Sequence, residues 1–162
     1  MIDKIMKVKK LMKRLTAILL VLCFNLSVLA TMAGVSKGAE WLTDFEKAKK
    51  EATKKKRPIL ADFSGLDWCK WCVKLDKKIF SRSAFKEFAR DNLVLFTADF
   101  PHKKEQSAAL KQQNKALSTT YAVRGFPTVL LLDSTGKELA RTGYRKGSAE
   151  AYVEHIKALM KK

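Results

Sequence analysis

Two cysteines that lie two residues apart form the clearest reactive pattern in this chain of 162 residues. Cys69 and Cys72 stand in the stretch Trp-Cys-Lys-Trp-Cys, between an apolar run and a segment with helical spacing. A sulfur atom at the start of a helix faces unpaired backbone N–H groups and the positive end of the helix dipole. Both stabilise a thiolate, which is the reactive form of cysteine. Because one helical turn brings the second sulfur close to the first, the pair is able to close a disulfide and to exchange it.

The number and placement of the cysteines favour chemistry over structural cross-linking. The chain has three cysteines, and Cys23 lies in an apolar N-terminal run. The remaining pair is not a framework of several bridges, and a bridge over so short a loop adds little stability through chain entropy. Half of a zinc site is the rival interpretation, but structural zinc takes four ligands. His102 and His155 have no ligand spacing, so the sequence predicts no metal and no cofactor.

The N-terminal segment has the pattern of an export signal. Basic residues crowd the first 14 positions, an apolar run follows at 15–24, and smaller residues come next. This order is typical of a secretory signal peptide. We therefore divide the chain into a signal peptide, residues 1–36, and one domain, residues 37–162, that is periplasmic or secreted. The alternative is an uncleaved anchor that leaves the domain facing the periplasm, since residues 15–35 are just long enough to span a bilayer.

The composition is that of a globular protein with a strongly basic surface. Lys and Arg total 33 against 16 Asp and Glu, which gives a formal charge of +17, and 47% of the residues are hydrophobic. Nucleic-acid binding would require basic residues clustered within a recognisable module. They are instead scattered over every predicted element, so we expect no nucleic-acid partner. A solvated lysine surface explains the charge, and weak attraction to anionic lipid or to acidic client proteins is compatible with it.

The order of the predicted elements is typical of an α/β domain. Strands are predicted at 40–42, 58–63, 93–100, 129–133 and 138–142. Helices are predicted before Pro58, from Cys69, after Ser83, at 103–121 with Leu110, Leu117 and Tyr121 inward, and after Ser148. The first part therefore forms a βαβ unit with parallel strands, and the last part forms a hairpin followed by a helix. This arrangement predicts a central mixed sheet with helices on both faces.

One carboxylate interrupts the apolar strand at 58–63. Because strand side chains alternate between the two faces of a sheet, Leu60 and Asp62 share one face, opposite Ile59, Ala61 and Phe63. If helices cover both faces, Asp62 is buried, and burial raises the pKa of a carboxyl group.

With these features in place, the domain resembles the thioredoxin superfamily over residues 41–162. The resemblance rests on Trp68-Cys69-x-x-Cys72 after the acidic strand, on Gly125-x-Pro127-Thr128 before a strand, and on Gly143 after the last strand. It implies a thioredoxin fold, which is a three-layer α/β/α sandwich with a central mixed sheet. Together with the export signal, the chain looks most similar to the small exported thioredoxin-like proteins of bacteria.

The resemblance also implies roles for individual residues. Cys69 matches the nucleophile, Cys72 the resolving cysteine, and Asp62 the buried acid that handles the proton of the resolving thiol. Pro127 matches a cis-proline that lies against the cysteine pair, and Phe126 offers its backbone to an extended substrate. The candidates for substrate binding are Trp68, Lys70, Trp71 and Phe126.

The chain departs from the cytosolic thioredoxins in two places. Lys70-Trp71 stands where Gly-Pro is usual, and one extra residue separates Asp62 from the cysteine pair. The first departure bears on the reduction potential. The second makes Asp67 a substitute candidate for the proton role. Trp68 has an alternative interpretation as a packed support for the helix, and Lys70 as a solvated lysine.

These features predict an exported thiol–disulfide oxidoreductase. We expect a monomer that reduces disulfides in other envelope or secreted proteins and is recharged by a membrane or soluble electron-transfer partner. The strong exported oxidants of this superfamily carry an added helical insert, and its lack here favours a reductase over a dithiol oxidase. From a different class, the alternative is a non-catalytic binding module or chaperone for exported chains. A third alternative keeps the same chemistry and delivers metal or haem by reducing an acceptor's cysteines.

Overall fold

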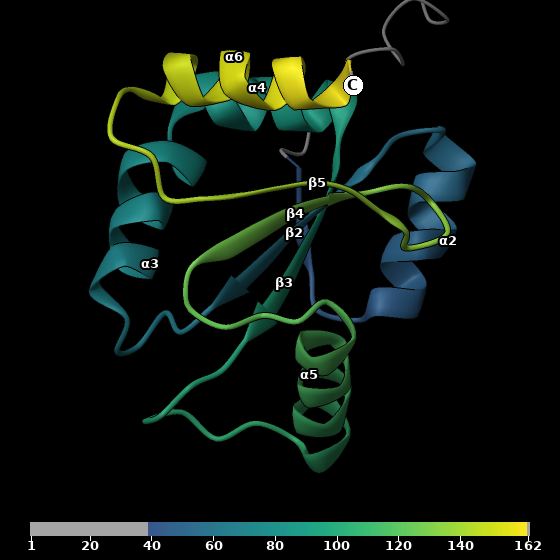
Figure 1. The fold of residues 1–162 in the computed structure, drawn as a ribbon, viewed down its shortest axis with the longest axis vertical. Coiled ribbons are helices and arrows are strands. Elements are labelled where there is room, and N and C mark those ends of the chain that lie inside the picture. Colours follow the sequence, from purple (N-terminus) through teal and green to yellow (C-terminus); the bar gives the residue numbers. More distant parts are fainter. Residues whose placement is uncertain (1–38, 162) are drawn as a thin grey trace, which may run out of the picture. The chain divides into compact units, whose positions relative to one another are not determined.

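A five-stranded mixed sheet organises the part of the chain that the computed structural model describes, residues 39–161. The strands are β1 (Trp41–Leu42), β2 (Ile59–Ser64), β3 (Val94–Asp99), β4 (Thr128–Leu132) and β5 (Glu138–Gly143), in the spatial order β1-β3-β2-β4-β5 (Figure 1). β3 pairs in parallel with β1 and β2, whereas β4 pairs in antiparallel fashion with β2 and β5. This confirms the predicted mixed sheet. The signal peptide or anchor lies outside the described residues, and the boundary at residue 36 stays a prediction.

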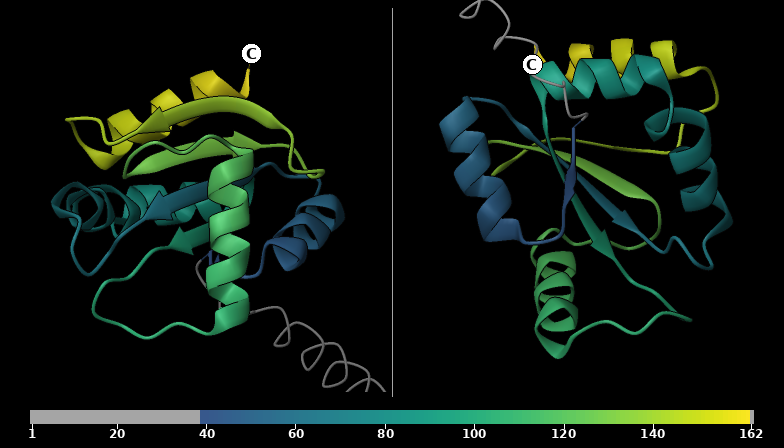
Figure 2. Two further views of the ribbon diagram at one scale, coloured as in Figure 1. Left: turned by 60° about the horizontal axis from the view of Figure 1, so that its bottom comes forward. Right: turned by 180° about the vertical axis from the view of Figure 1, so that it is seen from behind.

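Helices cover both faces of this sheet (Figures 1 and 2). They are α2 (Phe45–Lys55), α3 (Lys70–Leu75), the π-helical turn η2 (Asp76–Phe80), α4 (Ser83–Asn92), α5 (Ala108–Thr120) and α6 (Ala149–Met160). Side chains of α3, η2, α4 and α6 enter one core, and side chains of α2 and α5 pack on the other. The described domain is therefore the expected three-layer α/β/α sandwich. Within residues 39–161, none of the helices combines the length and the apolar character needed to cross a membrane.

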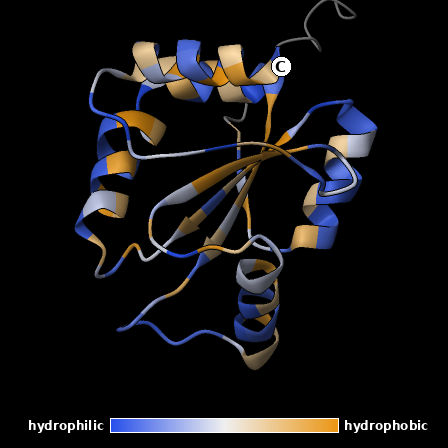
Figure 3. Ribbon diagram, viewed as in Figure 1, coloured by the Kyte–Doolittle hydropathy of each residue, from blue (hydrophilic) through white to orange (hydrophobic). Residues whose placement is uncertain are grey.

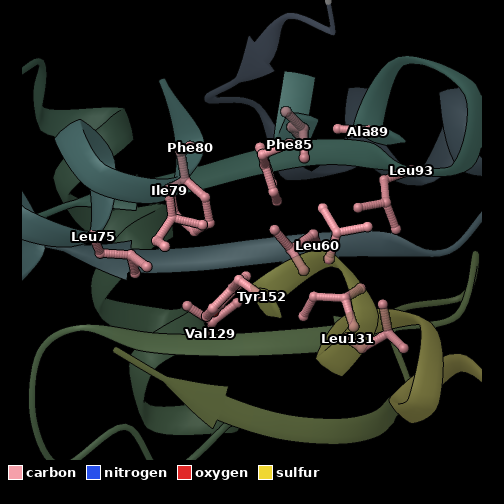
Figure 4. Close-up of a cluster of buried hydrophobic side chains, with 13 residues drawn as sticks. Leu60, Leu75, Ile79, Phe80, Phe85, Ala89, Leu93, Val129, Leu131 and Tyr152 are labelled. Atoms are coloured by element: carbon pink, nitrogen blue, oxygen red, sulfur yellow. The ribbon is translucent and has the colours of Figure 1, made fainter. Parts of the chain in front are cut away.

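The alternation along β2 separates the two cores. Leu60 joins the core under α3, α4 and α6, where it lies near Leu131 of β4 (Figure 4). Ile59, Ala61 and Phe63 point into the core under α2 and α5. All six residues of β2 are buried, and the apolar residues concentrate on the sheet and the inward helix faces (Figure 3). Since burying one large apolar side chain is worth about 1.5–3 kcal/mol, these two cores fix β2 as the rigid centre of the domain.

The connection between β3 and α5 differs from the prediction. The predicted helix over 103–121 begins only at Ala108, because Ser107 caps it by accepting a hydrogen bond from a backbone N–H in its first turn. The fully buried residue of α5 is Asn114, whose Nδ2 donates to the Asp99 carbonyl at the end of β3 over 2.9 Å. The residues predicted to face inward are only partly buried: Leu110, Leu117 and Tyr121. The shorter helix leaves a loop of eight residues, 100–107, after β3.

Candidate redox site

Four loops meet at the end of the sheet where β2 and β3 finish. β2 and β3 run in parallel, so their carboxyl ends lie together. β4 begins at the same end because Thr128 pairs with Phe63, and β5 ends there because Gly143 pairs with Thr128. The loops at this end are 65–69, 100–107, 124–127 and 144–148. Loops at the carboxyl ends of parallel strands are where α/β folds place their functional sites.

A disulfide between Cys69 and Cys72 lies in one of these loops, at the N-terminus of α3. Cys69 is the N-cap residue, and its Sγ accepts the Cys72 backbone N–H over 3.2 Å. The two Cα atoms are 5.3 Å apart. Cys69 is 7% exposed and Cys72 is 1% exposed. Cys69 is thus the more accessible sulfur, and in the dithiol form the helix N–H groups favour a thiolate at that position.

Asp62 is buried on the face of β2 that α3 and α6 cover, and it is only 5% exposed. Burial raises the pKa of this carboxyl group to about 7, the Ser64 hydroxyl opposes the rise, and the carboxylates of Asp76 and Asp99 add to it. Oδ1 of Asp62 and Oγ of Ser64 are buried without a hydrogen-bond partner among the described residues. A carboxyl group with a pKa near 7 exchanges its proton readily at neutral pH.

Asp67 ties the cysteine loop to the loop after β3. Its carboxylate accepts the backbone N–H groups of His102, Lys103 and Lys104 over 3.0, 2.6 and 3.2 Å. Desolvation opposes ionisation here, but the three donors outweigh it and lower the pKa of Asp67. A carboxylate that three donors hold in its ionised form is a poor proton acceptor. Asp62 is therefore the better candidate for the proton role.

Trp68 combines the two interpretations that the sequence allowed. The side chain is 41% exposed, yet its Nε1 donates to the Phe100 carbonyl over 2.8 Å. Its ring stacks on His102 with centroids 4.2 Å apart and an interplanar angle of 6°. It also meets the Phe126 ring edge-on at 5.8 Å. Trp68 is thus both a fixed support that joins three loops and an exposed rim beside the disulfide.

Gly65 leaves the space that the Trp68 indole occupies. A Cβ atom at Gly65 would lie 2.5 Å from the ring, which is closer than real contacts allow. We therefore predict that Gly65→Ala displaces the indole and lowers the free energy of unfolding by about 1–3 kcal/mol, as measured by urea denaturation. Gly125→Ala is the control, because a Cβ atom there has no neighbour within 4 Å. Equal losses in the two variants would contradict this explanation.

Trp71 and Tyr144 form a second exposed rim, built from α3 and the loop after β5. Their ring centroids are 5.1 Å apart, and Nζ of Lys74 lies 5.0 Å and 5.4 Å from them. Trp71 is 50% exposed, and Lys70 is exposed at the first position of α3. No sequence pattern pointed to Tyr144, Phe100 or His102, because only the pairing of the strands brings their loops to the cysteines.

The loop before β4 contains the predicted proline. The Phe126–Pro127 peptide bond is cis. Gly143 approaches this loop so closely that a Cβ atom would lie 2.9 Å from the Pro127 carbonyl oxygen. Oγ1 of Thr128 donates to the Gly125 carbonyl over 2.7 Å. These contacts fix the loop beside the end of β2, while its contact with a substrate stays a prediction.

The two histidines make contacts with residues other than Cys69 and Cys72. His102 stacks on Trp68, and Nε2 of His155 lies 2.9 Å from Oγ1 of Thr142. Within the described residues, no group of three or more His, Cys, Asp or Glu side chains is arranged to hold a metal ion together.

Comparison with known proteins agrees with this geometry. Residues 45–159 match the thioredoxin-like domain family. The chain belongs to this family. A solved structure of a DsbH oxidoreductase superposes on this thioredoxin-like domain with a TM-score of 0.74 and 35% identity, over 81% of this chain and 90% of that one. A thioredoxin from Thermus thermophilus shares the fold, with a TM-score of 0.58 and 14% identity over 76% of this chain and 88% of its own.

A curated relative is similar over the same domain. The chain is 41% identical over 105 residues to the disulfide bond reductase DsbH of Chlamydia pneumoniae. The aligned segment covers 65% of this chain and 63% of that protein, so this thioredoxin-like chain spans less than two thirds of its relative.

Proposed function

We propose that this chain is an exported thiol–disulfide oxidoreductase that reduces disulfides in other envelope or secreted proteins. The observation that carries the proposal is the Cys69–Cys72 disulfide at the N-terminus of α3. The name of the Chlamydia pneumoniae relative, a disulfide bond reductase, supports the reducing direction. Export and a periplasmic location rest on the signal pattern of residues 1–36.

The reaction begins from the dithiol form of the domain. The Cys69 thiolate attacks one sulfur of a client disulfide, the client S–S bond breaks, and the released client thiolate takes up a proton. Cys72 then loses its proton and attacks Sγ of Cys69, which breaks the mixed disulfide and releases the second client thiol. Two electrons and two protons pass to the client, and the domain is left with the Cys69–Cys72 disulfide. A dithiol donor, soluble or in the membrane, must reduce it again.

Asp62 accepts the proton of the resolving thiol. Its buried position beneath α3 and its pKa of about 7 support this role, because such a group gains and loses a proton near neutral pH. Phe126 and Pro127 present backbone to the client, while Trp68 and Trp71 supply exposed aromatic surface on two sides of the disulfide. Lys70, exposed beside the nucleophile, favours its thiolate.

Insulin reduction tests the proposed activity. The full-length chain, with dithiothreitol as the electron donor, is expected to accelerate precipitation of the insulin B chain well beyond dithiothreitol alone. The control carries both Cys69→Ala and Cys72→Ala. A binding module for exported chains would give no acceleration and would still bind an unfolded, cysteine-free client after both substitutions. That result would replace the reductase by the binding module.

A further inference from the structure

The loop formed by residues 102–104, which we term the 102–104 loop, places two lysines and a histidine next to the segment that leads into Cys69. His102, Lys103 and Lys104 are all exposed. They follow β3, at the same end of the sheet as the cysteine loop. The Asp67 carboxylate, two residues before Cys69, binds the backbone N–H groups of all three. The loop is therefore fixed against the segment that leads into the nucleophile.

A second set of contacts sets the orientation of the loop. Trp68, directly before Cys69, donates its indole N–H to the Phe100 carbonyl at the start of the connection. The same indole stacks on the His102 ring with nearly parallel planes. A client that reaches Cys69 across the exposed part of Trp68 thus passes the His102 ring, and the two exposed lysines follow His102 directly in the chain.

Lys103 and Lys104 have no carboxylate partner among the described residues, whereas three lysines on the helices do. On α2 and α6, Lys49, Lys55 and Lys157 pair with glutamates one helical turn away. Within residues 39–161, no such ion pair involves Lys103 or Lys104. The Asp67 carboxylate is taken up by backbone donors, and the exposed Glu105 is the nearest acid along the chain. The carboxylates of Asp67 and Glu105 offset the two lysine charges locally, but Arg124, Arg145 and Lys146 in the neighbouring loops leave this end of the sheet with a net positive charge.

Lys70 adds to the same positive region. It occupies the first position of α3, whose first turn contains no acidic residue. A lysine at this end opposes the helix dipole and costs the helix some stability. The stability of α3 therefore does not explain a lysine at this position, whereas the attraction of a negatively charged client toward Cys69 does.

We propose that the 102–104 loop is a client-recognition element that selects disulfides flanked by acidic residues. The proposal rests on the reductase function proposed above and names its substrate class. Charges at the rim of a contact act mainly on the rate of association and make it dependent on salt. The preference should therefore appear in the bimolecular rate constant and weaken as ionic strength rises.

Two synthetic peptides test this selection. Both contain the same disulfide-closed loop, and one is flanked by three Glu residues while the other is flanked by three Lys residues. The pre-reduced full-length chain is mixed with each peptide in a stopped-flow instrument at low salt. We expect the Glu-flanked peptide to react about tenfold faster, with the ratio falling toward one in high salt.

Two double variants locate the effect. Lys103→Gln with Lys104→Gln is expected to lower the Glu-to-Lys peptide ratio about three- to tenfold. The matched control is Lys50→Gln with Lys54→Gln, which makes the same charge change on exposed positions of α2, on the face of the sheet opposite α3. The control should leave the ratio unchanged.

Asp67→Asn distinguishes the effect of how the 102–104 loop is positioned from the effect of the local net charge. This variant makes the local charge more positive but weakens the hydrogen bonds from the backbone N–H groups of residues 102–104 to the side chain at position 67. If positioning matters, amide hydrogen exchange at 102–104 speeds up and the peptide ratio falls. If net charge alone decides, the ratio rises instead, and the proposal that a built loop performs the selection is overturned.

The remaining outcomes are equally decisive. Equal rates for the two peptides, or equal effects of the two double variants, would overturn the role of the 102–104 loop while leaving disulfide reduction intact. If the reduced chain reacts with neither peptide, the proposed function fails and the loop's role fails with it. If the loop variant loses co-sedimentation with phosphatidylserine vesicles but keeps the peptide ratio, the lysines bind lipid and the proposal is wrong.

Discussion

Replacing Cys69 by Ser is expected to lower the rate of disulfide reduction by the full-length chain at least about 10³-fold. A hydroxyl group has a pKa far above that of a thiol and forms no disulfide, so no mixed disulfide with the client can arise. Cys69 is the more exposed member of the pair and caps the helix that would stabilise its thiolate. The insulin assay and the peptide reaction both measure the loss.

Cys72→Ser separates the nucleophile from the resolving residue. This variant keeps the attacking sulfur but removes the group that releases the client, so a mixed disulfide at Cys69 should accumulate. Mass spectrometry of the non-reduced protein should show the added client, and dithiothreitol should remove it. If Cys69→Ser traps the client and Cys72→Ser does not, the two assignments are reversed and the account of the site is wrong.

The second large effect concerns Asp62 and the dependence of stability on pH. Burial raises the pKa of Asp62 from 3.8 to about 7. The folded state therefore holds a proton that the unfolded chain releases at a lower pH. Stability is highest below pH 4 with respect to this group, falls as the pH rises from about 4 to 7, and stays reduced above that range. Because one pKa unit corresponds to about 1.4 kcal/mol, the loss reaches up to about 4 kcal/mol.

Asp62→Asn is expected to remove this loss. The amide has nearly the shape of the protonated acid and carries no charge at any pH. In urea denaturation of the oxidised chain, the variant should be more stable than the wild type by up to about 4 kcal/mol at pH 9, and close to it at pH 4. The measurement at pH 4 is the internal control. A gain of the same size at both pH values would show that burial of the charge is not the cause.

The residues that define the site chemically were predictable because their patterns are local. The cysteine spacing places both sulfurs within one turn of a helix, and the alternation along β2 alone puts Asp62 on the face opposite Phe63. Pro127 was predictable from its neighbours along the chain. The mixed sheet followed in the same way, since the two apolar runs are strands separated by a helix and the last two strands are separated by a tight turn.

The parts that were not predictable depend on contacts between residues far apart in the chain. Asp67 and the 102–104 loop are about 35 residues apart, and three hydrogen bonds between them replace the helical turns expected there. Asn114 is buried although helix periodicity favours apolar residues inside, because the carbonyl at the end of β3 satisfies its amide. Tyr144 reaches Trp71 only because β5 ends beside β4. Each of these contacts is decided by tertiary packing, which outweighs local preference.

A redox titration of the full-length chain tests the central claim most directly. The chain is equilibrated with glutathione at graded ratios of thiol to disulfide, its free thiols are blocked, and the blocked residues are counted by mass spectrometry. The account predicts that Cys69 and Cys72 pass together between dithiol and disulfide in one reversible two-electron step, approached equally from either side. Two thiols that never form this couple, or two sulfurs held together on a zinc ion, would contradict it.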